Sequence, residues 1–542
     1  MLWLSGLERW RKATADSLPP SFTAQDMTGD MYSAQGGLVS ILDGMRVLHC
    51  ARARQLPSHR TACSSQQEYD RSGVLQSPMV LRSRPEGVTL RATSQKVPDY
   101  LGVAIAGTAI AMVFFGGTLQ KPILVTSGKL LLGLAGVLWT DLLPVVLILG
   151  GASRYLEGVA GAGAYMLIVG PVCVLAAWRF SQGRGVLRRG WLFLGLTVAC
   201  AAALSLFDVV DMSSAASTYA LLLLLLFMAI ACWQFPPVRS AVARAPMFVV
   251  LAAIFIFTSG FLALHFGGFD ASGRLRMVWS MNVNTYGIEL AQVGVFVLGY
   301  LTFLVSKAMR TLAWLSVASC AYLIFLTGSR SSLVGFVVGS LVILSSWAMQ
   351  RHRWRQALSS LIGGLVGVFV CGRAFATRFP ALVSRWSMSS IIGSQVASRV
   401  IIWRYALEDF ILHPLLGSGM GTNSLGIVWS TMGAPPYMQL ISSAHNIVLQ
   451  TLTAVGLVGA IPLLILCFAT LRAGAIGVNR RPTADVVPYL AVVVCTLVIG
   501  VGEGIYLDRI LWAAGAWTVV MATGSSNALI ARVVPGDGAE VQ

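Results

Sequence analysis

The chain has 542 residues, of which 56% are hydrophobic and only 11% are charged, and its mean hydropathy is +0.74. Because a soluble protein carries about 25% charged residues, this composition excludes a soluble enzyme and favours an integral membrane protein. The formal net charge is +17. Lys and Arg near membrane spans set the orientation of the protein, so this excess is no sign of nucleic-acid binding. We expect membrane lipids, and no nucleic acid, among the partners.

The first 99 residues differ from the rest of the chain. They are polar, with scattered Ser, Gln and Pro, and contain no apolar run long enough to cross a membrane. They also lack the order of charged, apolar and small residues that is typical of a signal peptide. We therefore predict a weakly ordered N-terminal tail over residues 1–99.

From Tyr100 onward the chain contains apolar stretches of about 17 to 25 residues, the length that a helix needs to cross the bilayer core. Strands are excluded because the runs are continuously apolar instead of alternating. The sequence therefore predicts an all-α fold, a polytopic bundle of about 12 transmembrane helices. The candidate spans, one of which we expect to be false, are 100–119, 128–150, 158–178, 190–207, 216–235, 246–264, 283–305, 311–327, 331–349, 356–372, 446–470, 485–501 and 510–530.

The candidate 128–150 is the weakest of these spans, because Asp141 and Pro144 interrupt it. The composition divides the whole chain into five parts. We expect short helices in the long loop 373–444. The predicted parts are an N-terminal tail (1–99), a transmembrane region (100–372), a long periplasmic loop (373–444), a second transmembrane region (445–534) and a C-terminal tail (535–542).

Basic residues gather in alternate loops, which the positive-inside rule places in the cytoplasm. The loops between them therefore lie outside. The basic residues are Arg179, Arg184, Arg188, Arg189, Arg239, Arg244, Lys307, Arg310, Arg351, Arg353, Arg355, Arg472, Arg480 and Arg481. The outer loops carry Asp208 and Asp211, Asp270, the turn at 327–330, the connection 373–444, and Glu503 with Asp508.

The first candidate element on the outer side is the turn Thr327-Gly328-Ser329-Arg330-Ser331-Ser332 between two apolar spans. It places Arg330 at the membrane boundary, where an Arg is costly unless it snorkels or meets an anionic partner. The alternative is that Arg330 merely anchors the following helix at the interface.

The second element lies in the long loop. Ile402, Trp403, Ala406, Leu407 and Phe410 have helical spacing, and the predicted helix ends near His413-Pro414. Arg399 shares a face with Trp403 one turn away. The alternative is an amphipathic interfacial helix whose Arg residues contact lipid head groups.

The third element is Ser442-Ser443-Ala444-His445-Asn446, where the long loop returns to the membrane. We expect Ser442 or Ser443 to cap a helix and to place His445 in its first turn. A helix N-terminus disfavours imidazolium, so His445 is expected to stay neutral and to accept a proton. The alternative is a hydrogen-bonded interfacial histidine.

These elements, with the motif His-Pro-Leu-Leu-Gly-Ser-Gly at 413–419, occur in the order and spacing of the O-antigen ligase and O-antigen polymerase superfamily, which the chain resembles over about 280–470. The resemblance implies a glycosyltransferase of the bacterial inner membrane that faces the periplasm. Such enzymes transfer a glycan from undecaprenyl diphosphate to an acceptor hydroxyl, on lipopolysaccharide core (lipid A-core) in a ligase or on a growing glycan in a polymerase. The resemblance implies no metal or cofactor.

By the same resemblance, Arg330 and Arg399 bind the diphosphate and His445 activates the acceptor hydroxyl. Arg suits this role because its fork binds phosphate bidentately and stays charged. We expect the three side chains to converge within about 10 Å. Further residues expected at the substrate are Arg404, Asn446, Ser329, Trp403 and Asn284, the last within a family-like polar patch at 282–285; Arg378 and Arg385 are candidates for steering anionic substrate.

Two other classes of function stay open at this point. Asp208 and Asp211 can in principle hold a divalent cation, as in a metal-dependent transferase, although two carboxylates alone make a weak site. A flippase or transporter of the same lipid-linked glycan would place ionisable residues near the bilayer midplane, where this sequence offers Asp141 and Glu289.

Overall fold

The computed structural model describes only part of the chain, all of it within the unit Gly87–Gln542. The predicted tails, the candidate span 356–372 and most of the loop 373–444, including Arg378 and Arg385, lie outside the described residues. The described residues are 96–153, 162–184, 188–208, 211–235, 240–269, 273–277, 283–349, 355, 394–421, 428–429, 432, 443–480, 485–504 and 507–533.

Within these ranges the regular secondary structure is helical, apart from one isolated β-bridge between Phe269 and Leu275. The predicted all-α class is therefore confirmed. The main helices are α4 (Lys96–Thr118), α5 (Pro122–Leu138), α6 (Leu143–Ala152), α8 (Met166–Arg179), α9 (Arg189–Leu204), α10 (Met212–Cys232), α11 (Ala241–Leu262), α12 (Val283–Tyr300), α13 (Lys307–Thr327), α14 (Arg330–Ala348), α18 (Ser394–Leu412), α21 (Ile447–Arg480), α22 (Val486–Gly502) and α23 (Arg509–Val533).

Among the described residues, seven helices are long and apolar enough to cross a membrane, and an eighth span results if one bent pair is counted. The shorter helices Met166–Gln182, Arg189–Leu204 and Val486–Gly502 are also apolar. The chain is thus a multi-pass membrane protein. The expected total of about 12 spans stays a prediction.

The candidate span 128–150, the weakest of the set, is a bent pair of helices instead of one straight helix. Helices α5 and α6 meet at an angle of 116°, and Asp141 lies in the short 3-10 turn between them. Pro144 lies in the first turn of α6, where its missing N–H costs no helical hydrogen bond. The two residues that interrupt the apolar pattern thus mark the break.

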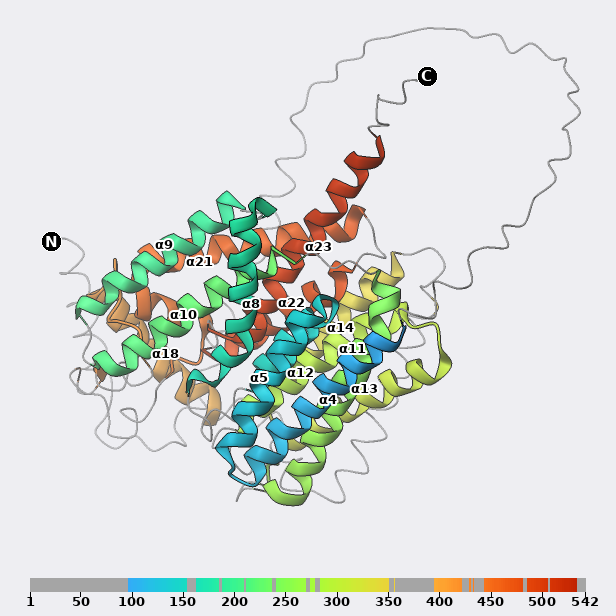
Figure 1. Cartoon of the computed structure of the whole chain (residues 1–542). Helices are drawn as coiled ribbons and strands as arrows, with labels where there is room; N and C mark the ends of the chain where they lie inside the picture. The colour runs from blue at the N-terminus through green and yellow to red at the C-terminus, as the bar shows by residue number, and fades with distance from the viewer. Residues whose placement is uncertain are drawn as a thin grey trace, which may run out of the picture. The chain divides into compact units, whose positions relative to one another are not determined.

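Helix α12 is the centre of the bundle. Every residue from Tyr286 to Tyr300 is buried, and α12 contacts α11, α13, α14 and α22. Figure 1 shows these helices grouped together, with α9, α10 and α21 beside one another on the other side of the bundle. Because α12 is enclosed on all sides, its two ends define the two ends of the protein core.

The end of α12 at Tyr300 contains a buried polar cluster. The Tyr300 hydroxyl lies 2.8 Å from the Tyr489 hydroxyl, and Arg244 forms an ion pair with Asp485. We expected Arg244 in a cytoplasmic loop; instead it is fully buried within α11, with its guanidinium 5.7 Å from the ring centroid of Phe248. A carboxylate and an aromatic face together compensate the lost hydration of the cation.

The turn that follows helix α18 is hydrogen-bonded to a kink in α21. Gly456 has φ +58° and interrupts the helical backbone, which frees the N–H groups that follow it. Leu457 N–H donates to the carbonyl of Pro414 at 2.9 Å, and Val458 N–H donates to that of Leu415 at 3.1 Å. The turn after α18 therefore fits into the kink and fixes the two helices against each other.

We predict that Gly456→Ala destabilises this joint. A Cβ at Gly456 would lie 2.2 Å from the carbonyl oxygen of Leu415, and its positive φ is unfavourable for any residue with a side chain. At a cost of about 1 to 3 kcal/mol, the thermal unfolding midpoint in detergent should fall by several degrees. Gly170→Ala is the control, because a Cβ there meets nothing within 4 Å. Equal midpoints for the two variants would show that the kink contributes nothing.

Candidate active site

Segments that are far apart in the sequence meet at the end of α12 that begins with Val283. A Cβ built on Gly287 would touch Thr327 and Ser329, at the junction of α13 and α14. A Cβ on Gly502, the last residue of α22, would lie 3.1 Å from Nη1 of Arg399 and 3.5 Å from Cβ of Ser331. The start of α14, the end of α22 and the guanidinium of Arg399 are therefore neighbours.

The predicted turn before α14 is present. Helix α13 ends at Thr327, Gly328 takes the left-handed conformation with φ +61°, and α14 begins at Arg330. The hydroxyls of Ser329 and Ser332 lie 2.6 Å apart, and both side chains are buried. Ser329 therefore shapes the turn from inside the protein, while Arg330 is half-buried at the helix start.

The loop that carries His445 is built differently from the expectation. Asn446, and not Ser443, caps α21: its Oδ1 accepts from the N–H of Val448 at 2.9 Å and of Leu449 at 3.1 Å. Ser442 lies outside the described residues. His445 thus precedes the helix instead of lying in its first turn, and its φ of +48° is left-handed. The amide oxygen of Asn446 reaches both N–H groups. The two serines before it suggested a cap three or four residues earlier in the chain.

Two side chains hold this loop in place. The backbone N–H of His445 donates to Oγ of Ser443 at 3.1 Å, and the N–H of Ala444 donates to Oε1 of Gln450 at 2.6 Å. The amide of Asn446 also donates to the carbonyl of Val501 at 3.3 Å. The backbone before α21 is thereby tied to the end of α22.

The carboxylate of Glu503 is the centre of the site. Its Oε2 lies 3.2 Å from Nδ1 of His445, and its Oε1 accepts a hydrogen bond from Nδ2 of Asn284 at 3.1 Å. Nη2 of Arg399 lies 3.7 Å from the same Oε1. The Glu503 side chain is only 7% exposed, whereas those of Arg399 and His445 are 34% and 32% exposed. One nearly buried carboxylate therefore joins three of the predicted residues.

This arrangement fixes the chemistry that His445 can perform. An N–H at Nδ1 donates to Glu503, which leaves Nε2 as the acceptor nitrogen of the neutral ring. A carboxylate in this position holds the ring in one orientation and stabilises the imidazolium that forms when Nε2 takes a proton. The geometry is that of a general base supported by an acid.

Sequence reasoning missed Glu503 as a site residue and used it only to orient the loops. A signal was present, since Glu503 follows a span directly and stands between Gly502 and Gly504. A Cβ on Gly504 would lie 2.3 Å from Oγ of Ser443, so glycine is needed where this segment passes the His445 loop. Arg274, which bonds to Asn284, was missed as well.

Arg404 lies away from this cluster. Its Nε donates to Glu408 at 3.1 Å and its side chain is 53% exposed. Five residues of helix separate it from Arg399, which places it about 140° around α18. The two Arg residues therefore face different sides of the helix.

The buried face of α18 differs in part from the expected one. Of the apolar residues with helical spacing, Ile402 and Ala406 are buried and Trp403 packs beside them, but Leu407 is 47% exposed. Asp409 takes a place on the buried face, where its Oδ2 accepts from the hydroxyl of Ser418 at 2.8 Å. Burial raises the pKa of the Asp409 carboxyl. On the buried face of α18, the polar contact between Asp409 and Ser418 thus takes the place of an apolar contact by Leu407.

Asp211, one of the two carboxylates of the candidate cation site, has a structural role. Asp211 caps α10, since its Oδ1 accepts from the N–H of Ser214 at 3.1 Å and from the hydroxyl of Ser213 at 2.9 Å. Among the residues that the structure describes, no group of three or more His, Cys, Asp or Glu side chains is placed to hold a metal ion. The observed role of Asp211 is therefore to begin a helix.

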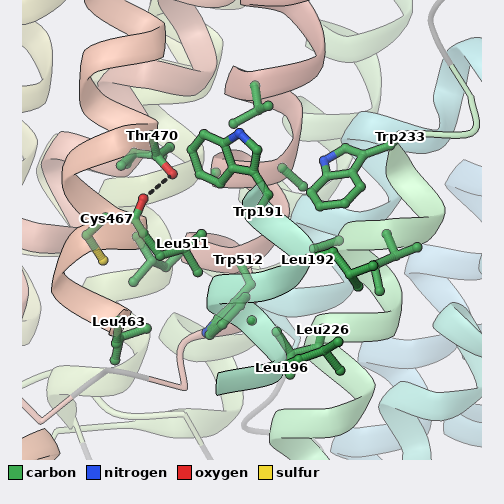
Figure 2. Close-up of a pocket in the computed structure, with 18 of the residues that line it drawn as sticks. Trp191, Leu192, Leu196, Leu226, Trp233, Leu463, Cys467, Thr470, Leu511 and Trp512 are labelled. Carbon is green, nitrogen blue, oxygen red and sulfur yellow. Dashed lines mark hydrogen bonds between the residues drawn. The ribbon is translucent and has the colours of Figure 1, made fainter. Parts of the chain in front are cut away.

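An apolar cavity of about 90 Å³ lies among α9, α10, α21, α22 and α23. Figure 2 shows Trp191 and Trp233 on one side of it and Thr470, whose hydroxyl bonds to a backbone carbonyl of its own helix, on another. Ile447, which follows the His445-Asn446 pair directly, also lines it. Other lining residues are Leu192, Leu196, Leu226, Leu463, Leu466, Val493, Leu511, Trp512 and Val519.

Part of the chain that contains several of the site residues matches a known protein family. Residues 314–464 match the family model described as O-antigen ligase. This segment of the chain is similar to O-antigen ligases. This match supports membership of the chain in the O-antigen ligase family and covers Arg330, Arg399 and His445, whereas Asn284 and Glu503 lie outside it. No curated protein matches the chain.

We predict that Gly504→Ala separates Glu503 from His445. The added Cβ would collide with Ser443 and would lie 2.9 Å from Oε1 of Gln450, so the two segments must move apart. Diethyl pyrocarbonate should then modify His445 faster than in the wild type, as followed by peptide mass spectrometry. Gly515→Ala is the control, because its Cβ would make an ordinary 3.7 Å contact with Thr470. Unchanged His445 modification in Gly504→Ala would contradict the close packing of these segments.

Proposed function

We propose that the chain is a glycosyltransferase of the O-antigen ligase type. It transfers a glycan from an undecaprenyl diphosphate carrier to an acceptor hydroxyl at the periplasmic face of the bacterial inner membrane. The observation that carries this proposal is the junction at Glu503, where Arg399 and His445 meet in a membrane protein with an O-antigen ligase domain. A cation for phosphate and a base for a hydroxyl are what such a transfer requires.

In the proposed reaction, Nε2 of His445 takes the proton of the acceptor hydroxyl as its oxygen attacks C1 of the sugar. The bond between C1 and the diphosphate oxygen breaks, and the diphosphate leaves with the electron pair. Glu503 stabilises the resulting imidazolium. One displacement at C1 gives inversion at the anomeric carbon, and the chemistry needs no metal ion because protein cations meet the developing negative charge.

Arg399 and Arg330 are the proposed diphosphate ligands. The Arg399 side chain is one-third exposed, and its Nη2 lies 3.7 Å from Oε1 of Glu503, so N–H groups remain for a phosphate. The start of α14 lies beside it, as the neighbours of Gly502 indicate. An Arg that shares a carboxylate with His445 brings the leaving group and the base to the same place, which is the positional requirement for direct displacement.

The place of the site along the bundle supports the proposed orientation. Glu503 follows the end of α22, whereas Asp485 precedes its start and pairs with Arg244 at the opposite end. Arg310, in the first turn of α13, also lies near that opposite end, since its Nε donates to the carbonyl of Leu304 just after α12. Basic loops at one end and the site at the other agree with a cytoplasmic and a periplasmic side.

In this proposal the apolar cavity in Figure 2 takes up at most a short part of the carrier's isoprenoid tail. A diphosphate at Arg399 and His445 needs a route for its isoprenoid tail, and Ile447 joins the site to an apolar lining. In this proposal Asn284 positions Glu503, Asn446 and Ser329 shape the two loops, and Trp403 contacts substrate or lipid head groups beside the site. Arg404, which pairs with Glu408 on the exposed side of α18, is not required for substrate binding. Lipid A-core is the proposed acceptor; a growing glycan, as in a polymerase, would give longer products.

We predict that His445→Ala lowers transfer by about 10²- to 10⁴-fold. The measurement is product formation in proteoliposomes that contain undecaprenyl diphosphate-linked glycan and lipid A-core. Arg404→Ala is the matched control, because Arg404 pairs with Glu408 on the exposed side of α18, and it should keep its rate within about threefold. Product length separates ligation from polymerisation. Product formation by His445→Ala at a rate close to the wild type would reject His445 as the base. A wild-type protein that forms no product but moves the lipid-linked glycan across the bilayer would be a transporter.

A further inference from the structure

Arg274 lies in the segment 273–277, which precedes α12 in the chain and contacts the end of α13. The backbone N–H of Leu275 donates to the carbonyl of Leu326 at 2.9 Å, and the side chains of Leu275 and Met277 are buried. The segment is thus packed against the bundle on both sides of Arg276, which is exposed. Arg274 itself is half-buried.

The guanidinium of Arg274 spans two elements of the site. Its Nε donates to the carbonyl of Thr327, the last residue of α13, at 2.7 Å. Its Nη2 donates to Oδ1 of Asn284. A cation at a helix C-terminus is favourable in itself, but that explanation accounts only for the bond to Thr327.

The bond to Asn284 determines how this amide is oriented. Arg can only donate hydrogen bonds, whereas an Asn side chain has one acceptor end and one donor end. With Oδ1 facing Arg274, Nδ2 faces Oε1 of Glu503 at 3.1 Å. The reversed amide would place an oxygen against the carboxylate and leave Glu503 without this donor.

We propose that Arg274 is a positioning residue for the proposed transfer reaction, on which this inference rests. Through Asn284 and Glu503 it fixes the orientation and the tautomer of His445. The chain of contacts runs from the Arg274 guanidinium to the Asn284 amide, then to the Glu503 carboxylate and finally to Nδ1 of His445. The chemical reason is that the acid which supports a base must itself be held by donors.

The charges around this chain give the direction of the expected effect. The described charged groups that face Glu503 are Arg399 on α18 and His445 before α21, with Arg274 behind Asn284 and Arg330 at the nearby start of α14. Removing Arg274 takes away a positive charge and the hydrogen-bond donor to Asn284. Both disfavour the binding of an additional proton by the cluster around Glu503. The base should then be protonated up to a higher pH.

The test is the pH dependence of transfer by full-length Arg274→Gln in proteoliposomes with undecaprenyl diphosphate-linked glycan. We expect kcat to fall about tenfold, the acid limb of kcat/KM to move to higher pH, and KM for the carrier to stay within about twofold. Arg274→Lys keeps the charge and one donor, and should restore the pH profile in part. Arg276→Gln, two residues away and exposed, should behave as the wild type.

Two results would overturn the inference while the proposed function stands. A lower unfolding midpoint with an unchanged pH profile would make Arg274 a helix cap only. A raised KM with unchanged kcat would make it a diphosphate ligand. If instead the wild type transfers no glycan to any acceptor, the proposed function itself fails and the inference falls with it.

Discussion

The site depends on one carboxylate that is almost removed from water. A buried charge is costly unless donors surround it, and Glu503 obtains its partners from Asn284 at the start of α12, Arg399 on α18 and His445 before α21. These partners are separated by long stretches of sequence. Any conformation that leaves one of them away from Glu503 pays an electrostatic penalty, so the carboxylate selects the conformation in which the base and the cation are together.

The backbone makes this meeting possible at two places. Gly502 and Gly504 allow the segment that carries Glu503 to pass within contact distance of Arg399 and Ser443. The kink at Gly456 accepts the turn after α18, so the helix that bears Arg399 is held against the helix that follows His445. The orientation of the site residues is therefore set by the packing of whole helices and not by a flexible loop alone.

Local patterns in the sequence predicted the features that depend on neighbours in the chain. Apolar runs gave the helices, Gly328 gave the turn before Arg330, and His413-Pro414 gave the end of α18. Features that depend on distant residues were not predictable in this way. The cap at Asn446 relies on its contact with Val501, and the burial of Arg244 relies on Asp485.

Glu503 shows the same limit most clearly. As an acid after a membrane span it is indistinguishable from any solvated loop residue until Asn284, Arg399 and His445 are placed around it. Family resemblance did not compensate, because it ends before Glu503 and rests on Arg330, Arg399 and His445. The proposed base was therefore named from the sequence, whereas the carboxylate beside it became apparent only in the fold.

The central claim, that these groups act through a single carboxylate, is tested most directly by a double-mutant cycle on the rate of glycan transfer with Asn284→Ala and Glu503→Gln. Residues that act through one shared group have non-additive effects. The account predicts that Asn284→Ala slows the wild type clearly but changes the rate of Glu503→Gln by less than about twofold. The same fold reduction by Asn284→Ala in both backgrounds would contradict it.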